Sequence, residues 1–80
     1  MIRLTLLYFA ALRDAAGVPM ETIETNAPTL RALYDEAQVR HGLPFRSRQL
    51  RVAVNDTFAS WDDTPREGSE VVFIPPVSGG

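Results

Sequence analysis

The residues with the clearest chemical potential are the last two glycines of the sequence, Gly79 and Gly80. Because neither carries a side chain, a segment ending in them can enter a channel too narrow for any Cβ. We expect Gly80 to be the C-terminus. Its carboxylate, with an ordinary pKa of roughly 3.3–3.7, is then an anion and a poor electrophile at neutral pH. Such a group reacts with a nucleophile only after activation, for example by adenylation with ATP.

The residues just before the two glycines are suited to carrying this carboxylate away from a folded body. Pro75 and Pro76 lack a backbone N–H, so they end a strand at residue 74 and favour an extended exit. Six extended residues reach about 20 Å. We therefore expect a folded domain over residues 1–74 and a flexible tail over 75–80. The residues expected to thread into a partner are Pro75, Pro76, Val77, Ser78 and Gly79.

The sequence contains no machinery to activate the carboxylate. It has no Cys, and all eight basic residues are Arg. Those absences exclude a cysteine nucleophile, a Schiff-base lysine and cysteine-ligated zinc or iron–sulfur sites. There is no Gly-rich phosphate loop, and the single histidine, His41, has no nucleophile near it in sequence. We expect no metal and no bound cofactor, with the catalysis supplied by partners.

Composition indicates a soluble globular domain. The hydrophobic fraction is 45% and the charged fraction 22%, which argues against disorder. A net charge of −2 gives no electrostatic reason to expect a nucleic-acid partner. The apolar stretches are shorter than the roughly 20 residues of a membrane span, and no signal-peptide pattern is present. We expect a cytoplasmic protein with neither nucleic acid nor membrane as partner.

Hydrophobic periodicity predicts the elements that position the tail. Period-two or continuous apolar runs indicate strands over residues 2–9, 18–25, 50–54, 57–61 and 70–74. Residues 10–16 favour a short helix that stops at Gly17. The main helix begins after Thr29, a suitable N-cap, and ends at Gly42. Its apolar face, at i, i+3, i+4 and i+7 spacing, consists of Leu30, Leu33, Tyr34 and Ala37.

This order of elements predicts an α+β fold with two hairpin-like halves and one main helix laid across one face of a mixed sheet of four to five strands. That is the ubiquitin-like β-grasp arrangement, in which the first and last strands are parallel neighbours. Their ends then meet beside the tail, on the face without a helix. We expect Phe9 and Ile74 to form an apolar docking patch there, joined by Phe58.

Four segments give the sequence a specific resemblance: YFAALRD at 8–14, PTL at 28–30, VNDT at 54–57 and GSEVVFIPPVSGG at 68–80. Together they resemble the small subunits of molybdopterin synthase, a family of β-grasp sulfur carriers. The resemblance spans essentially the whole chain, and its PPVSGG terminus is the most specific part. Ser69 departs from the family, which more often has Asp there.

The resemblance implies a concrete role. An adenylating enzyme similar to ubiquitin activators would use ATP to adenylate Gly80, and a sulfur donor protein would lead to a Gly80 thiocarboxylate. The chain would be a non-catalytic, sulfur-donating subunit, and its tail would enter the large molybdopterin synthase subunit in a two-plus-two heterotetramer. There the sulfur would pass to the pterin precursor of the molybdenum cofactor. The implied partner-binding residues are Phe9, Phe58 and Ile74, with Arg13 at the rim.

Other roles for a Gly-Gly end remain open. Related carriers supply sulfur for thiazole, for cysteine or for tRNA thiolation. A ubiquitin-like modifier would instead join Gly80 to lysines of targets, although a chain without Lys cannot form lysine-linked polymers of itself. A third alternative is an interaction module with an inert tail, and removal of Gly80 separates it from the others.

Overall fold

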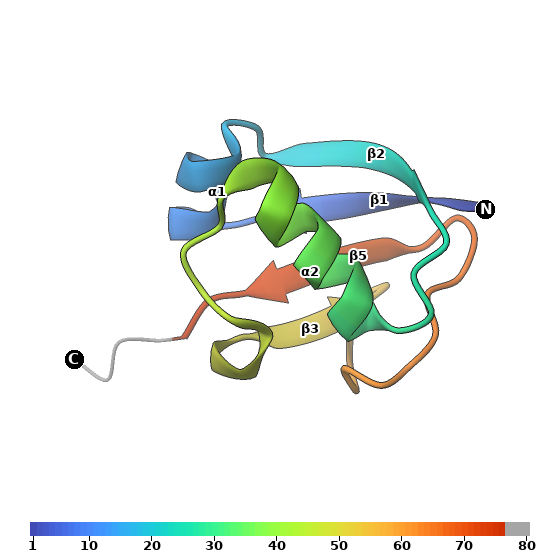
Figure 1. Ribbon diagram of the computed structural model, residues 1–80. Coiled ribbons are helices and arrows are strands. Elements are labelled where there is room, and N and C mark those ends of the chain that lie inside the picture. Colours follow the sequence, from blue (N-terminus) through green and yellow to red (C-terminus); the bar gives the residue numbers. More distant parts are fainter. Residues whose placement is uncertain (77–80) are drawn as a thin grey trace.

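A five-stranded mixed sheet organises residues 1–76, the part of the chain that the computed structural model describes (Figure 1). The strands lie in the order β2-β1-β5-β3-β4, with β1 and β5 parallel and the other pairs antiparallel. Their bounds are β1 (Ile2–Tyr8), β2 (Met20–Thr25), β3 (Arg51–Val54), β4 (Thr57–Ala59) and β5 (Glu70–Ile74). The predicted α+β arrangement with adjacent parallel first and last strands is confirmed.

The main helix, α2 (Leu30–His41), covers one face of this sheet (Figure 1). Thr29 caps it as predicted, because its side chain accepts a hydrogen bond from the Ala32 backbone N–H at 3.1 Å. Gly42 ends it with φ of 66°, a left-handed conformation that costs glycine little. The buried face of α2 is the predicted set of Leu30, Leu33, Tyr34 and Ala37.

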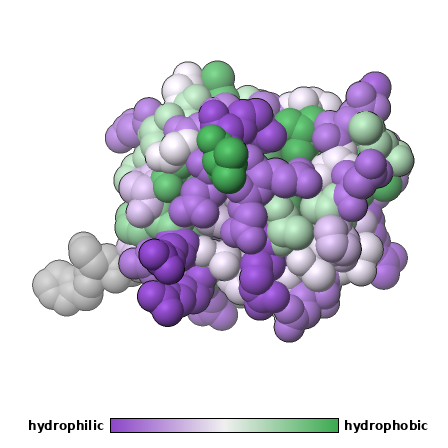
Figure 2. All heavy atoms as spheres, viewed as in Figure 1, coloured by the Kyte–Doolittle hydropathy of each residue, from purple (hydrophilic) through white to green (hydrophobic). Residues whose placement is uncertain are grey.

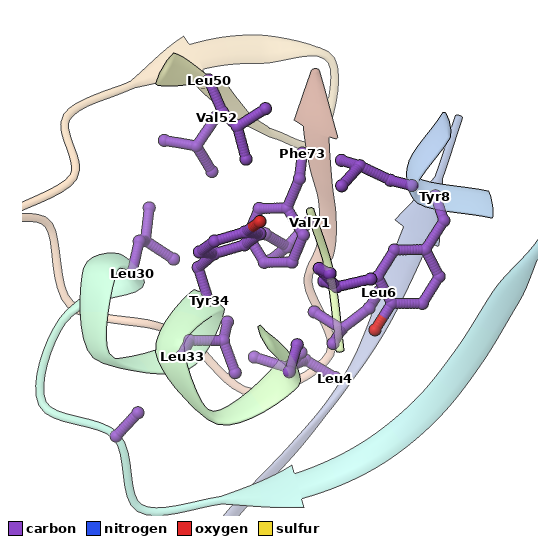
Figure 3. Close-up of a cluster of buried hydrophobic side chains, with 14 residues drawn as sticks. Leu4, Leu6, Tyr8, Leu30, Leu33, Tyr34, Leu50, Val52, Val71 and Phe73 are labelled. Carbon is purple, nitrogen blue, oxygen red and sulfur yellow. The ribbon is translucent and has the colours of Figure 1, made fainter. Parts of the chain in front are cut away.

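The core lies between α2 and the covered face of the sheet (Figure 3). Phe73 of β5 is fully buried at its centre, with its ring 4.9 Å from that of Tyr34 in an edge-to-face contact. Trp61 stacks on Phe73 with ring centroids 6.0 Å apart, and its ring also meets that of Tyr34 edge-to-face at 5.9 Å. The Tyr34 hydroxyl donates to the Phe45 carbonyl at 2.5 Å, which fixes the chain after α2 against the helix.

The structure differs from the sequence prediction on both sides of β3. A short 3-10 helix, η1 (Ser47–Gln49), occupies part of the expected loop. The strand expected over 57–61 ends at Ala59, because Trp61 packs against the core rather than continuing the ladder. Its indole N–H donates to the Leu50 carbonyl at 3.3 Å, so side-chain burial takes precedence over strand pairing there.

Two short connections follow from local chemistry. Asn55 and Asp56 join β3 to β4 with φ of 49° and 70°, the left-handed pair of a tight hairpin turn that Asn and Asp tolerate. The short helix α1 (Ala10–Ala16) follows β1 directly and ends at Gly17, whose φ is 79°. Both the turn and the short helix were predicted.

Burial of both tyrosines predicts an alkaline transition. Burial, with a smaller effect from Glu21, raises the pKa of Tyr8 to about 12, and burial also raises the pKa of Tyr34 to about 12. The unfolded chain releases these protons near pH 10, so between pH 10 and 12 it binds fewer protons than the folded chain. Stability should therefore fall as pH rises through this window. Absorbance at 295 nm should show no phenolate near pH 10 in the folded protein but a clear step in denaturant; a step near pH 10 in both would contradict the packing.

Candidate functional site

The site begins where β5 ends. Ile74 is the last strand residue, and β5 is hydrogen-bonded to β1 on one side and β3 on the other. Pro75 and Pro76 follow outside the strand, as their missing N–H groups require. Pro75 and Pro76 therefore leave from an interior strand of the sheet, where Phe73 pairs with Tyr8 of β1 and Ile74 with Arg51 of β3. The predicted threading residues Val77, Ser78 and Gly79, and the predicted reactive residue Gly80, lie outside the described residues.

The uncovered face of the sheet carries an apolar hollow of about 300 Å³ beside this exit. Phe9 is 52% exposed and Phe58 60% exposed, which is unusual for phenylalanine in a small domain. We call this surface the aromatic hollow; its lining residues are Leu7, Phe9, Ala53, Asp56, Phe58, Val72 and Ile74. The structure thus brings the three predicted patch residues, Phe9, Phe58 and Ile74, to one place.

Strand alternation explains why this face is apolar at one end. Along β5, Val71 and Phe73 point into the core, so Val72 and Ile74 point to the other face. Residue pairing then places Leu7 and Ala53 on either side of Val72. The continuous apolar run of β5 indicates that both faces of this strand are apolar. The same period-two reasoning identifies Val72 and Ala53, which the sequence prediction had left out.

Phe9 is placed by the start of α1. It is the N-cap of that helix in an extended conformation, and its carbonyl accepts hydrogen bonds from the Leu12 and Arg13 N–H groups at 3.0 and 3.3 Å. Its side chain is therefore held at the end of β1 next to the hollow. Arg13 itself is exposed on α1 but is not among the residues that line the aromatic hollow. Its predicted rim position remains a prediction.

Arg51 adds a charged border that the sequence prediction did not assign to this surface. Its guanidinium carbon lies 4.3 Å from the centre of the Phe58 ring, in a cation–π contact. In the sheet Arg51 pairs directly with Ile74, the last residue before the tail. Alternation along β3 was the available signal, because it places Arg51 on the same face as Ala53.

Several charged side chains among residues 1–76 form ion pairs rather than a cluster of metal ligands. No group of three or more His, Cys, Asp or Glu side chains there is arranged to hold a metal ion. His41 is occupied by Glu21, with its Nε2 2.7 Å from a carboxylate oxygen, and Arg40 binds the other oxygen at 2.8 Å. Across the same described range, no helix is both long and apolar enough to span a bilayer.

Comparison with known proteins decides the family. The ThiS family model matches residues 6–80. The chain belongs to the ThiS family. Two full-length relatives are each named "molybdopterin synthase sulfur carrier subunit". The Escherichia coli protein is 35% identical over 92% of this chain and 95% of its own length. The Mycobacterium tuberculosis protein is 35% identical over the whole of both chains.

Solved structures agree with this membership in the ThiS family. A putative molybdopterin converting factor subunit 1 from Pyrococcus furiosus superposes with a TM-score of 0.79 at 30% identity, covering 96% of this chain and all of that one. A chain from the complex of subunits 1 and 2 of molybdopterin-converting factor from Helicobacter pylori 26695 has a TM-score of 0.67 at 20% identity, covering 99% of this chain and 100% of that chain. At that identity the second match bears on the fold alone. The predicted β-grasp fold and sulfur-carrier family are confirmed.

Phenylalanine-to-alanine substitutions on the two faces of the sheet should have different effects. One should weaken partner binding and the other should lower folding stability. Phe58→Ala removes an exposed ring of the aromatic hollow, so thermal unfolding should change little while partner binding weakens by about 2 kcal/mol or more. Phe73→Ala removes a fully buried ring and should cost about 3–5 kcal/mol of folding stability. Denaturant unfolding measures the change in folding stability, and titration calorimetry with the partner protein measures the change in binding. Unfolding of the Phe58→Ala variant at 25 °C would show that Phe58 belongs to the core.

Proposed function

We propose that this ThiS-family chain carries sulfur as a thiocarboxylate on Gly80 and delivers it to the large subunit of molybdopterin synthase. The observation that carries the proposal is the geometry of the exit: the central strand β5 leads into the PPVSGG segment beside an exposed aromatic hollow. A single end of the molecule thus offers a surface for a partner and the start of a slim tail. The full-length relatives named as sulfur carrier subunits of molybdopterin synthase support the choice of pathway.

The chemistry at Gly80 proceeds in two displacements. Its carboxylate oxygen attacks the α-phosphorus of ATP, releasing pyrophosphate and giving an acyl adenylate. A sulfur nucleophile at the oxidation level of sulfide then attacks the acyl carbon, and AMP leaves with the C–O electrons. The product is a thiocarboxylate, whose sulfur is the nucleophile in transfer to the pterin precursor. The activating enzyme binds ATP, and a sulfur donor protein supplies the sulfur.

Residues of this chain contribute position rather than catalysis. The β1–β5–β3 pairing holds Ile74 so that Pro75 and Pro76 start the tail from a fixed point. The aromatic hollow offers the partner an apolar volume of about 300 Å³ to fill, with Phe9 and Phe58 as the exposed anchors. Gly79 and Gly80 leave the end of the tail without side chains, which suits passage into a narrow active site.

Intact mass spectrometry tests the proposal directly. The chain is incubated with ATP, a cognate activating enzyme and a sulfur source, and then with a thiol-alkylating reagent. Because the sequence contains no Cys, we expect one alkyl adduct, mapped to Gly80, and none on a chain that lacks Gly80. Oxidation of Met1 or Met20 gives no alkylated product, so it cannot imitate this result.

Three further outcomes separate the alternatives. Absence of the adduct, with an activating enzyme that loads a known carrier in parallel, would overturn sulfur loading and favour a modifier or an inert tail. If the adduct forms, the thiocarboxylated chain is mixed with the large subunit and the pterin precursor. Formation of the dithiolene product supports the molybdopterin pathway. Loading without transfer would assign the chain to one of the other sulfur-carrier pathways.

A further inference from the structure

The arginines of this chain differ in whether they have a partner. Within residues 1–76, three form ion pairs with carboxylates: Arg3 with Glu24, Arg31 with Asp62 and Arg40 with Glu21. The other five have no carboxylate within salt-bridge distance in that part of the chain. They are Arg13, Arg46, Arg48, Arg51 and Arg66.

Three of these unpaired cations follow one another through the same short segment. Arg46 lies just before η1, Arg48 lies within it, and Arg51 begins β3. We call these three residues the arginine strip. All three are exposed. The segment passes from α2, where Arg46 and Arg48 share a second hollow with Asp35 and Gln38, to the open face of the sheet. Figure 2 shows strongly hydrophilic side chains gathered at the end of the molecule where β5 ends.

Arg51 is held in a geometry that suits carboxylate recognition. Its guanidinium carbon lies over the Phe58 ring, 4.3 Å from the ring centre, and the N–H donors of a guanidinium form a planar fork. The contact with the ring also restricts a side chain that is otherwise costly to order. The fork therefore meets an incoming planar carboxylate already oriented, and it can donate two parallel hydrogen bonds.

Position and charge together identify the kind of partner. Arg51 lies beside Ile74 and over Phe58, so a group bound to it also sits at the border of the aromatic hollow. The chain as a whole carries a formal charge of −2, so the strip is a local basic region on an acidic molecule. Such a region directs an acidic surface to this end in preference to others. Asp56, which also lines the hollow, disfavours a second carboxylate inside it, so the hollow itself takes an apolar group.

We propose that the arginine strip, with the guanidinium of Arg51 over Phe58 at its end, binds an acidic segment of a partner protein. An Asp or Glu carboxylate pairs with Arg51, and an adjacent apolar side chain enters the aromatic hollow. Arg46 and Arg48 accelerate the encounter through their charge. The inference rests on the proposed function for the existence of the partner, and it adds the chemistry by which the partner's docking segment is selected.

Association kinetics with the large molybdopterin synthase subunit of the same organism test the proposal, using the full chain at about 50 and 500 mM salt. Arg51→Ala should raise the dissociation constant by on the order of tenfold. Arg51→Lys should recover only part of that loss, since it keeps the charge but not the planar fork. The double variant Arg46→Glu with Arg48→Glu should slow association at low salt and differ little at high salt.

Arg66→Ala is the matched control. Arg66 is also exposed and without an ion pair in the described residues, but it lies in the loop before β5, at the opposite end of that strand. Arg66→Ala removes the same charge as Arg51→Ala, and it should leave the association and dissociation rates unchanged. Thermal unfolding of every variant shows whether the fold is retained. Phe58→Leu gives a second test, because it keeps an apolar group in the hollow while removing the ring under Arg51.

The outcomes are distinct. If the complex forms and the Arg51 variants bind within about twofold of the unaltered chain, the arginine strip is not a carboxylate site and the inference falls alone. If the unaltered chain fails to bind the large subunit at either salt concentration, the proposed function falls and the inference with it. Inorganic phosphate and AMP serve as probes of a different occupant. Saturable shifts of the Arg51 and Phe58 NMR signals with either one, below millimolar concentration, would assign the strip to phosphate and overturn the proposal.

Discussion

The parallel pairing of β1 with β5 fixes the centre of the sheet and, with it, the point where the chain leaves the fold. It joins the first and last strands of the chain, from Thr5 opposite Glu70 to Tyr8 opposite Phe73. The pairing places the end of β5 in the interior of the sheet rather than at an edge, so the tail starts from a position held on both sides. A parallel neighbour also brings the ends of both strands to the same edge, and this puts Phe9 next to Ile74.

The sheet that this pairing joins has one face covered by α2 and one face open to solvent. On the covered face Phe73 meets Tyr34 edge-to-face and stacks with Trp61, and this packing supplies stability in a chain of only 80 residues. On the open face the residues of the same strands remain available to a partner. A sheet covered on one side only thus buries Phe73 in the core and leaves Phe58 exposed on the opposite face. This chain contains neither Cys nor Lys, so it offers no thiol or amine side chain to the proposed sulfur chemistry.

Local sequence patterns predicted most elements because each rests on short-range physics. The α2 helix was set by a Thr cap, apolar spacing and a glycine end, and the β3–β4 turn by Asn55 and Asp56, which tolerate positive φ. The early end of β4 and the 3-10 turn η1 were not predicted. Trp61 lies outside the ladder, with its ring stacked on Phe73 and its indole N–H donating to the Leu50 carbonyl, and a local sequence pattern does not specify these two contacts.

Sequence patterns alone were enough to locate most strands and both α-helices, and to show the absence of cysteine and lysine side chains and the family resemblance that ends in Gly-Gly. It also predicted three residues of the aromatic hollow, because strand alternation assigns faces without knowledge of contacts. Folding was needed to show that the Arg51 guanidinium lies over Phe58, that Arg13 does not line the hollow, and which arginines pair with carboxylates within residues 1–76. These properties depend on distances between side chains from separate strands and loops, and such distances exist only once the sheet has formed.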